Sequence, residues 1–531
     1  MREADTTKLG GLATGLIVVI ALAAANHLLF SWMGFNPTDE GFYLAAARRV
    51  ADGQVPHHDF LSIRPMGAAL LYAPIAHWGG DSVFWIARFF VWLEHAAIAW
   101  LWVDIVDRAF GRPLTLGTRI ALVVAAFALA VARYPIYVTT TVEALFVSTV
   151  GIAVRSTADE RNGYRRLIAY AIMGFAPVCR QNFLLIGPIA IIVYGDWSRV
   201  RYWIAWAAPI AGYVAWVAES GPGSVQAMFE QLHGYTALVH YGVVTYVQRP
   251  ELWAGILVAL ATIVGRRQAA LGPIMLATCL VAFGLNGRLL VPMYVLMPFA
   301  VFGAALVVAA ELAYRKQRDR AAVAIMALAC AWSASISLGL NAPVLGVGML
   351  LALVVVWSGP ARSRAVIIGL AAAVAVVFLN ARRGRITVDG PARELACAVP
   401  STFPGARHLR TDPTTCRLLE DMPRAVALAG SRRYALLPDF AAYWVAAPFA
   451  NPLPMDWPWD AELTTDHARA RVIAALDSQR GQVAAVVCRV QVARIEYYGI
   501  QPVGPGYSTP ADYVRAHWTL VGRTAFFDVY E

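Results

Sequence analysis

The sequence predicts an α-helical polytopic membrane protein with about thirteen transmembrane helices, followed by a small C-terminal α/β domain outside the membrane. Three observations predict this fold class. Hydrophobic residues make up 59% of the chain and charged residues only 15%, well below the roughly 25% charged residues of soluble domains. Apolar runs recur along the first 380 residues, and the composition changes after them. The chain therefore divides into a transmembrane module, 1–380, and an outer domain, 381–531.

The apolar runs are interpreted as helices because only a helix satisfies all of its backbone hydrogen bonds while crossing lipid alone. The two runs that flank Arg180 are also compatible with a single broken helix. The predicted spans are 11–33, 83–106, 118–140, 144–157, 167–179, 183–194, 203–218, 252–265, 269–285, 289–312, 321–338, 342–358 and 365–380.

The arginines predict the orientation of these spans. They gather in short, alternate connections and beside the N-terminus, as is typical of cytoplasmic loops. The loops 34–82 and 219–251 and the C-terminal domain then lie outside, so we expect a multi-pass protein of the bacterial inner (plasma) membrane with a periplasmic or extracellular C-terminal domain. The net charge of +10 is dispersed over many loops, which argues against a nucleic-acid partner.

The C-terminal domain is predicted from short segments with opposite periodicities. "YALLP", "VAAVVCRV" and "AFFDVY" are typical of strands, whereas "DHARARVIAALDSQ" has helical spacing. Cys397, Cys416 and Cys488 also fall in this domain. In an oxidising compartment Cys397 and Cys416 can pair, although the odd third cysteine leaves the pairing open. The remaining cysteines lie in apolar runs and are expected to pack as small hydrophobic residues.

Charged residues concentrate in the first outer loop, 34–82. Thr38 can cap a helix that carries Asp39 and Glu40 in its first turn and ends at Gly53, and such a helix would lie on the membrane surface. Acids in a first turn also complement the helix dipole, and that role alone would account for them.

The wider loop favours a binding site, because unsatisfied charge at a membrane boundary is costly. An arginine there suits an anionic head group, and a neighbouring carboxylate can accept a proton from a hydroxyl. The charged residues of this loop that we consider are Asp39, Glu40, His57, His58, Asp59 and Arg64.

The opening loop resembles that of the GT-C membrane glycosyltransferases. The similarity lies in the acidic pair after the first span, in "VPHHDF" and in "SIRPMGAALLYAP". The closest parallels are lipid A aminoarabinose transferases and protein O-mannosyltransferases. Two later segments resemble the family more weakly, "RYPIYVTTTVEALF" at 133–146 and "GRLLVPMYVLMP" at 287–298. Many relatives have Lys-Pro where this chain has Arg64-Pro65, which keeps the charge and allows bidentate phosphate contact.

The resemblance implies an inverting glycosyltransferase that uses a polyprenyl-phosphate sugar. Asp39 would be the catalytic base, assisted by Glu40, and the acceptor would be a hydroxyl of an extracytoplasmic glycan, glycolipid or protein. Arg64 and Arg288 would bind the donor phosphate. No cofactor is required, and a divalent metal is not indicated.

Three further residues are candidates for substrate binding, namely Glu143, Arg180 and Tyr294, and some of the candidates have simpler alternatives. Glu143 and Arg180 could line the substrate site, or serve as a helix-start residue and an interfacial anchor. Arg288 could merely extend its charge to the head groups. Tyr294 follows it in the segment that resembles the family.

The residues of the histidine segment and two tryptophans of the C-terminal domain also have more than one interpretation. His57, His58 and Asp59 could bind a metal, but adjacent imidazoles on an extended segment point apart. Contact with the sugar or with a neighbouring loop is favoured. Trp457 and Trp459 could stack on an acceptor sugar or belong to a core strand and a rigid loop.

Three other function classes fit parts of the sequence. A lipid-linked sugar transporter should carry internal repeats, and none is seen. A polysaccharide polymerase or ligase using lipid-diphosphate donors would more often place its key residues in a late outer loop, whereas here the charges come first. A non-catalytic scaffold would tolerate the substitution Asp39→Asn.

Overall fold

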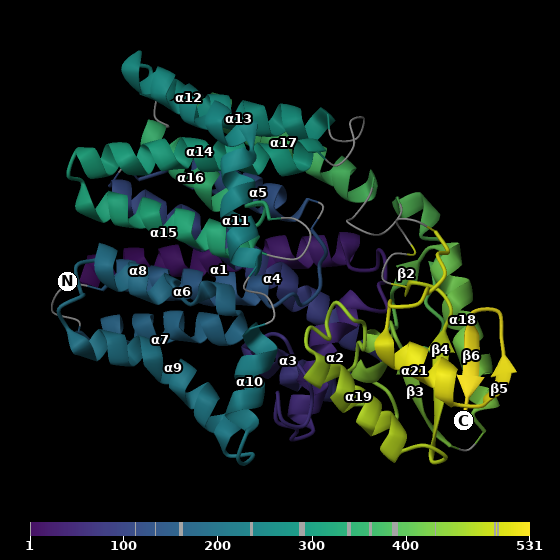
Figure 1. Ribbon diagram of the computed structural model, residues 1–531. Helices are drawn as coiled ribbons and strands as arrows, with labels where there is room; N and C mark the ends of the chain where they lie inside the picture. The colour runs from purple at the N-terminus through teal and green to yellow at the C-terminus, as the bar shows by residue number, and fades with distance from the viewer. Residues whose placement is uncertain are drawn as a thin grey trace.

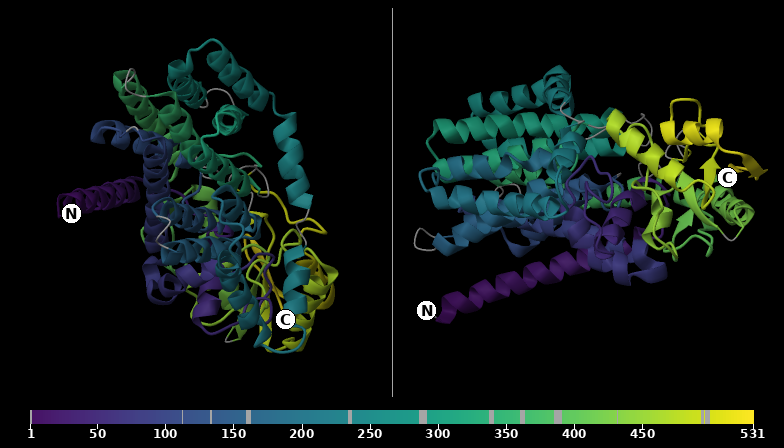
Figure 2. Two further views of the ribbon diagram at one scale, coloured as in Figure 1. Left: turned by 90° about the vertical axis from the view of Figure 1, so that its left-hand side faces the viewer. Right: turned by 60° about the horizontal axis from the view of Figure 1, so that its bottom comes forward.

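The long helices lie side by side, and a smaller domain, which contains all the strands that the structure describes, covers one end of them (Figure 1 and Figure 2). This arrangement is seen in a computed structural model, which describes residues 2–111, 113–132, 134–158, 163–233, 237–285, 292–336, 341–359, 364–384, 391–430, 432–492, 495 and 499–531. Within these ranges, the side chains of 2–12, 237–239, 241, 283–285 and 292–296 are not described. The predicted fold class, helical with a small C-terminal α/β domain, is confirmed.

The helical part is built from seventeen described α-helices. In chain order they are α1 (Arg2–Phe30), α2 (Asp39–Ala51), α3 (Gly67–Trp78), α4 (Val83–Phe110), α5 (Leu116–Val131), α6 (Thr141–Ser156), α7 (Gly163–Cys179), α8 (Ile186–Val193), α9 (Val200–Ala218), α10 (Ser224–His233), α11 (Ala237–Gln248), α12 (Pro250–Val264), α13 (Gln268–Leu285), α14 (Pro292–Tyr314), α15 (Arg318–Ser335), α16 (Val347–Ser358) and α17 (Arg364–Gly384). Two short 3₁₀ helices, η1 (Gly80–Ser82) and η2 (Gln181–Phe183), precede α4 and follow α7.

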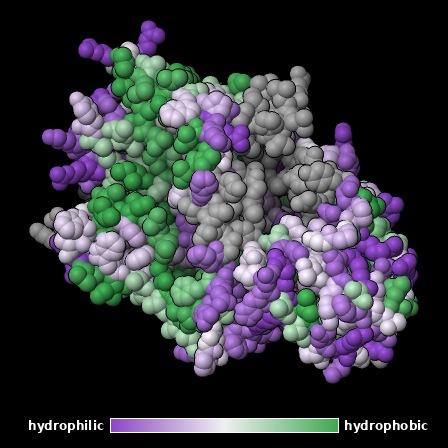
Figure 3. Space-filling view, viewed as in Figure 1, coloured by the Kyte–Doolittle hydropathy of each residue, from purple (hydrophilic) through white to green (hydrophobic). Residues whose placement is uncertain are grey.

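Apolar side chains gather on the outside of the helical part, whereas the surface of the C-terminal domain is mainly hydrophilic (Figure 3). Leu257 and Val264 on α12 and Val376 on α17 are each more than 60% exposed, as expected of side chains that face lipid. Four helical segments within the described residues are long and apolar enough to cross a membrane, or five if the bent pair α11 and α12 counts as one span: Ala13–Phe30, Gly80–Phe110, Met297–Tyr314 and Arg364–Gly384.

The predicted number of thirteen spans is therefore not confirmed. Several predicted spans correspond to helices that are shorter than a bilayer crossing requires, such as α6 with 16 residues and α8 with 8. Others carry arginines within the helix. The sidedness of the membrane and the domain boundary at residue 380 stay predictions.

The helix break at Arg180 is present. Its backbone is extended, with φ −155° and ψ 123°, between α7 and η2. Pro177 lies in the last turn of α7, where its ring removes a backbone donor and weakens the helix. The break places the Arg180 side chain at a bend between two helices instead of along a continuous helix face.

The C-terminal domain contains a four-stranded sheet in the order β3-β4-β6-β5. β3 (Arg433–Leu437) is parallel to β4 (Val483–Cys488), and β6 (Phe527–Tyr530) is antiparallel to both β4 and β5 (Leu520–Arg523). Around it lie the helices α18 (Pro413–Leu428), α19 (Asp466–Ser478) and α21 (Thr509–His517) and the 3₁₀ helices η4 (Ala392–Glu394) and η5 (Ala441–Val445). The three predicted strands and the predicted helix all match observed elements.

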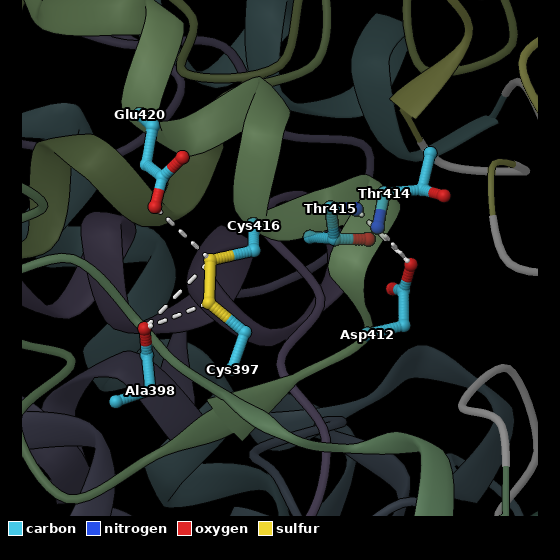
Figure 4. The surroundings of a disulfide bond; sticks show 7 residues. All are labelled: Cys397, Ala398, Asp412, Thr414, Thr415, Cys416 and Glu420. Atoms are coloured by element: carbon cyan, nitrogen blue, oxygen red, sulfur yellow. Dashed lines mark hydrogen bonds between the residues drawn. A yellow bond between two sulfur atoms is a disulfide. The ribbon is translucent and has the colours of Figure 1, made fainter.

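A disulfide joins Cys397 to Cys416, with 6.2 Å between the two Cα atoms (Figure 4). It links the small hairpin of β1 (Cys397–Ala398) and β2 (Arg410–Thr411) to the first turn of α18. Asp412 caps that helix, because its Oδ1 atom accepts hydrogen bonds from two backbone N–H groups of the first turn. The other four cysteines are buried and free. Burial is predicted for Cys179, Cys279 and Cys330 in the apolar runs, whereas the sequence leaves the state of Cys488 open.

Helix α2 corrects one prediction. We expected it to lie on the membrane surface, but most of its residues are buried because η5 of the C-terminal domain packs on it. Gly41 makes this approach feasible, since a Cβ atom there would lie 1.9 Å from the Cα atom of Ala442. The backbone N–H of Ala442 also donates to the carbonyl of Pro37 at 2.9 Å. The C-terminal domain thus forms one wall of the first outer loop.

Candidate functional site

The side chain of Asn36 fixes the first turn of α2. Its Oδ1 atom accepts hydrogen bonds from the backbone N–H groups of Thr38, at 2.9 Å, and Asp39, at 3.2 Å. The Thr38 hydroxyl donates to the same oxygen. Thr38 is the N-cap residue, as predicted, but its own side chain makes no capping hydrogen bond. Asn36 therefore sets the position at which Asp39 enters the helix.

Asp39 is half-buried among charged side chains that are distant from it in the sequence. Burial, followed by the negative charge of Glu462, raises the pKa of the Asp39 carboxyl to about 6, and Asp439 adds to this shift. The positive charge of Arg64 and a hydrogen bond with Tyr137 act in the opposite direction. A carboxylate with a pKa just below neutral is mainly ionised at pH 7 and is a better proton acceptor than an ordinary aspartate.

Arg64 lies in the same cluster. Its guanidinium makes a fork-shaped contact with Glu462, with 3.1 Å from Nη1 to Oε2 and 3.4 Å from Nη2 to Oε1. The guanidinium also lies over the rings of Phe42 and Tyr43, 5.9 and 5.5 Å from their centroids. Only 12% of the Arg64 side chain and 3% of the Glu462 side chain are exposed. The contact with Glu462 uses the N–H groups of Nη1 and Nη2, which could otherwise bind an anion.

Arg180 is a second buried arginine beside this cluster. Its Nη1 atom donates to the hydroxyl of Thr140 at 3.0 Å and to the carbonyl of Thr139 at 3.3 Å. Its charged and hydrogen-bonding surroundings include Arg64 and Tyr43. Its Nε atom is buried and has no hydrogen-bond partner among the described residues. Two guanidinium groups of like charge, held close together and largely away from solvent, have the chemistry to bind an anion.

Glu40 has a different environment from its neighbour Asp39. Both of its carboxylate oxygens bind Arg88, at 2.6 Å to Nε and 2.7 Å to Nη2, and Glu40 is 1% exposed. Arg88 also donates to the carbonyls of Ser31, Met33 and Gly34. This closed network favours a structural role for Glu40, which attaches α2 to α4, over the catalytic role that we expected.

His57 joins the first outer loop to α9 and α10. His57 is fully buried, and its ring contacts the hydroxyl of Tyr213 at 2.8 Å and the amide oxygen of Gln231 at 3.1 Å. Burial lowers the pKa of His57 to about 4, so its ring is neutral. His58 is exposed and pairs with Asp59 at 2.8 Å. The structure shows the contact with neighbouring segments, while contact with a sugar stays a prediction.

The remaining predicted residues have mixed outcomes. Glu143 is fully buried in the first turn of α6, within reach of the charge on Arg180. Trp457 is buried, donates to Asp439 at 2.8 Å and stacks on Trp459, with 5.2 Å between ring centroids. This stack supports the packing interpretation for Trp457, while Trp459 remains half-buried. Arg288 and the side chain of Tyr294 lie outside the described residues.

Four residues of the cluster were missed by the sequence analysis, namely Tyr43, Tyr137, Asp439 and Glu462. Asp439 had a detectable signal, because it follows β3, which is parallel to β4, and side chains after the carboxyl ends of parallel strands often form sites. Glu462 follows an aromatic and proline-rich stretch and carries no comparable pattern. It reaches Arg64 only through the tertiary fold.

No protein-family model matches the chain, and no curated protein matches it. Among solved structures, the chain is similar to ArnT from Cupriavidus metallidurans bound to undecaprenyl phosphate, with a TM-score of 0.42 and 13% identity over 99% of this chain and 98% of that chain. The apo state of that protein has a TM-score of 0.42 and 12% identity, over 98% of each chain. Neither likeness assigns a role to a residue of this chain.

Proposed function

We propose that the protein is an inverting glycosyltransferase that moves a sugar from a polyprenyl-phosphate donor to a hydroxyl group of an extracytoplasmic acceptor. The observation that carries the proposal is the half-buried Asp39, with its raised pKa, beside the partly buried Arg64 and the buried Arg180. A proton acceptor next to an anion site is the minimum that a single displacement from a sugar phosphate requires.

The reaction proceeds in one displacement. The acceptor oxygen forms a bond to the anomeric carbon, while the bond between that carbon and the phosphate oxygen breaks. Asp39 takes the proton of the acceptor hydroxyl, and the electron pair of the broken bond leaves with the polyprenyl phosphate. One carboxylate is sufficient because phosphate is already a good leaving group. Attack opposite the leaving group inverts the anomeric configuration, as in inverting glycosidases.

Arg64 and Arg180 stabilise the charge that develops on the departing phosphate. The partly desolvated position of both side chains strengthens this interaction. Glu462 accepts both hydrogen bonds from the fork of Arg64 and so fixes the position of the guanidinium. A phosphate competes with this carboxylate for the same donors. Glu143 is then available, near Arg180, to orient a hydroxyl of the donor or the acceptor.

The test compares cells that lack the gene with cells that carry it. Without the protein, a polyprenyl-phosphate sugar should accumulate and one envelope carbohydrate should lose a sugar. A copy encoding the wild-type protein should reverse both changes, and one encoding Asp39→Asn should reverse neither. The matched control is Asp52→Asn, which removes an exposed aspartate at the end of the same helix and should restore both. Unchanged carbohydrates and unchanged lipid-linked sugars in the deletion strain would rule out the transferase.

A further inference from the structure

A pocket of about 670 Å³ lies where two membrane-spanning segments meet the C-terminal domain. The span Ala13–Phe30 ends two residues before Trp32, and Asp81 is the second residue of the span Gly80–Phe110. Because Trp32 and Asp81 line the same pocket, the two segments end at the same face of the membrane. The pocket therefore opens at the level of the lipid head groups on the side of the C-terminal domain.

The remaining wall of the pocket is the loop 398–410, which is held rigidly. The backbone N–H of Arg410 donates to the carbonyl of Trp32 at 2.8 Å, and that of Arg407 donates to the carbonyl of Asp81 at 3.0 Å. The disulfide at Cys397 anchors the start of the loop to α18 (Figure 4). These links hold the loop against both membrane-spanning segments, so the pocket does not depend on a flexible surface segment.

The lining is strongly basic. Arg407, His408 and Arg410 are all exposed and border the pocket, whose acidic lining residue is Asp81. Within the part of the chain that the structure describes, neither guanidinium has an ion-pair partner. His408 has a φ of 77°, a conformation that few non-glycine residues adopt, and its ring lies 5.6 Å from that of Trp85. The backbone is thus held in an uncommon conformation at the pocket wall.

We propose that this pocket binds the phosphate of an anionic lipid head group from the adjacent leaflet. Arginine is the side chain best suited to bind phosphate through two parallel hydrogen bonds. Tryptophan residues such as Trp32 and Trp85 are typical of the interface where such head groups lie. The volume is within the range of sites that enclose a small molecule. The site is separate from Asp39, and it does not depend on the proposed transfer reaction.

The test measures lipid binding to the purified full-length protein by native mass spectrometry. Phosphatidylglycerol and phosphatidylcholine with identical acyl chains are titrated separately. The test variant combines Arg407→Gln and Arg410→Gln. The matched control combines Arg417→Gln and Arg424→Gln, which removes two exposed arginines from α18. Glycerol 1-phosphate, added as a competitor, distinguishes a free phosphate from a phosphate that is held only as part of a lipid.

The wild type should bind phosphatidylglycerol at least about tenfold more tightly than phosphatidylcholine, since hydrogen bonds to charged groups contribute that much. The test variant should lose this preference and the control variant should keep it. Competition by glycerol 1-phosphate would support a phosphate site open to soluble ligands, and absence of competition would support a site for intact lipid. Equal binding of the two lipids by the wild type would overturn the proposal, and so would an unchanged preference in the test variant. The lipid comparison on the wild type decides the question even if the test variant fails to fold.

Discussion

Asp39 and Glu40 are consecutive acids in the first turn of α2, yet they belong to two different regions of the molecule. Glu40 faces α4, where Arg88 binds both of its oxygens and neutralises it in a buried network. Asp39 faces the C-terminal domain, where Glu462 opposes its ionisation and Arg64 only partly compensates. The carboxylate of Glu40 therefore stabilises the fold. The ionised carboxylate of Asp39 is disfavoured by its surroundings, so it is more basic than an ordinary aspartate. The comparison separates an acid in a closed ion-pair network from the acid that we propose as the proton acceptor.

The substitution Asp39→Asn should have the largest effect, because it should abolish most of the transfer activity and yet increase the stability of the fold. Removal of a general base lowers the transfer rate by about 10²–10⁴-fold.

The free energy of unfolding of this variant should be higher than that of the wild type at neutral pH. The pKa of Asp39 is raised in the folded protein from 3.8 to about 6, so the folded state holds more protons than the unfolded state between these values. Stability consequently falls as the pH rises through this window, and asparagine avoids that loss, which we place at about 1–3 kcal/mol. Thermal unfolding in one detergent, measured beside a transfer assay, checks both parts. A variant that is both inactive and less stable would contradict the comparison.

The substitution Glu40→Gln should have the opposite effects: lower stability of the fold and substantial remaining transfer activity. It leaves Arg88 buried without its counter-charge, which destabilises the fold by about 3 kcal/mol or more. The three backbone carbonyls that Arg88 also contacts limit the loss. We expect a lower unfolding temperature and, in the protein that remains folded, substantial transfer activity. Glu394→Gln, at an exposed acid, is the control and should leave stability unchanged. Full stability with complete loss of transfer in Glu40→Gln would restore the catalytic role.

The contact between α2 and the C-terminal domain can be tested at Gly41. Alanine there would place a Cβ atom 1.9 Å from Ala442, so α2 and η5 must separate. Overpacking of this kind costs about 1–3 kcal/mol, and the shift should also lower transfer by displacing Asp39 from its position beside Arg64. Gly369→Ala in α17, where nothing lies within 4 Å of the added atom, is the control and should retain wild-type stability. Equal stability of the two variants would show that the close approach is absent.

The smallest effect is expected for Glu462→Gln. Loss of the carboxylate removes the group that competes with phosphate for the fork of Arg64. The apparent affinity for the polyprenyl-phosphate sugar should therefore rise by a few-fold, roughly the contribution of one hydrogen bond. Loss of a negative charge near Asp39 should also lower the pKa of Asp39 and so move the acid limb of the rate profile to lower pH. Asp460→Asn nearby is the control. An unchanged acid limb would mean that Glu462 does not act on Asp39.

The sequence predicted those parts of the site that come from one loop or one local pattern. Asp39 and Arg64 lie in the same outer loop, and the two apolar runs that flank Arg180 indicate that a helix can break there. Glu462 and Asp439 could not be assigned to the site, because they are about 400 residues away and reach it only when the C-terminal domain packs on α2. For the same reason α2 was expected at the membrane surface, since nothing near Gly41 reveals that Ala442 covers it. The number of spans could not be fixed because many helices are too short or too charged to be recognised as membrane crossings.

The account depends most directly on Asp39 accepting a proton with a pKa near 6. The decisive measurement is the pH dependence of kcat/KM for sugar transfer by the wild-type protein, which reports the essential groups of the free enzyme. We predict an acid limb, with activity that falls as the pH drops below about 6, because a protonated Asp39 cannot take the proton of the acceptor. Activity that stays constant from pH 7 down to pH 4.5, with the protein folded throughout, would contradict the account.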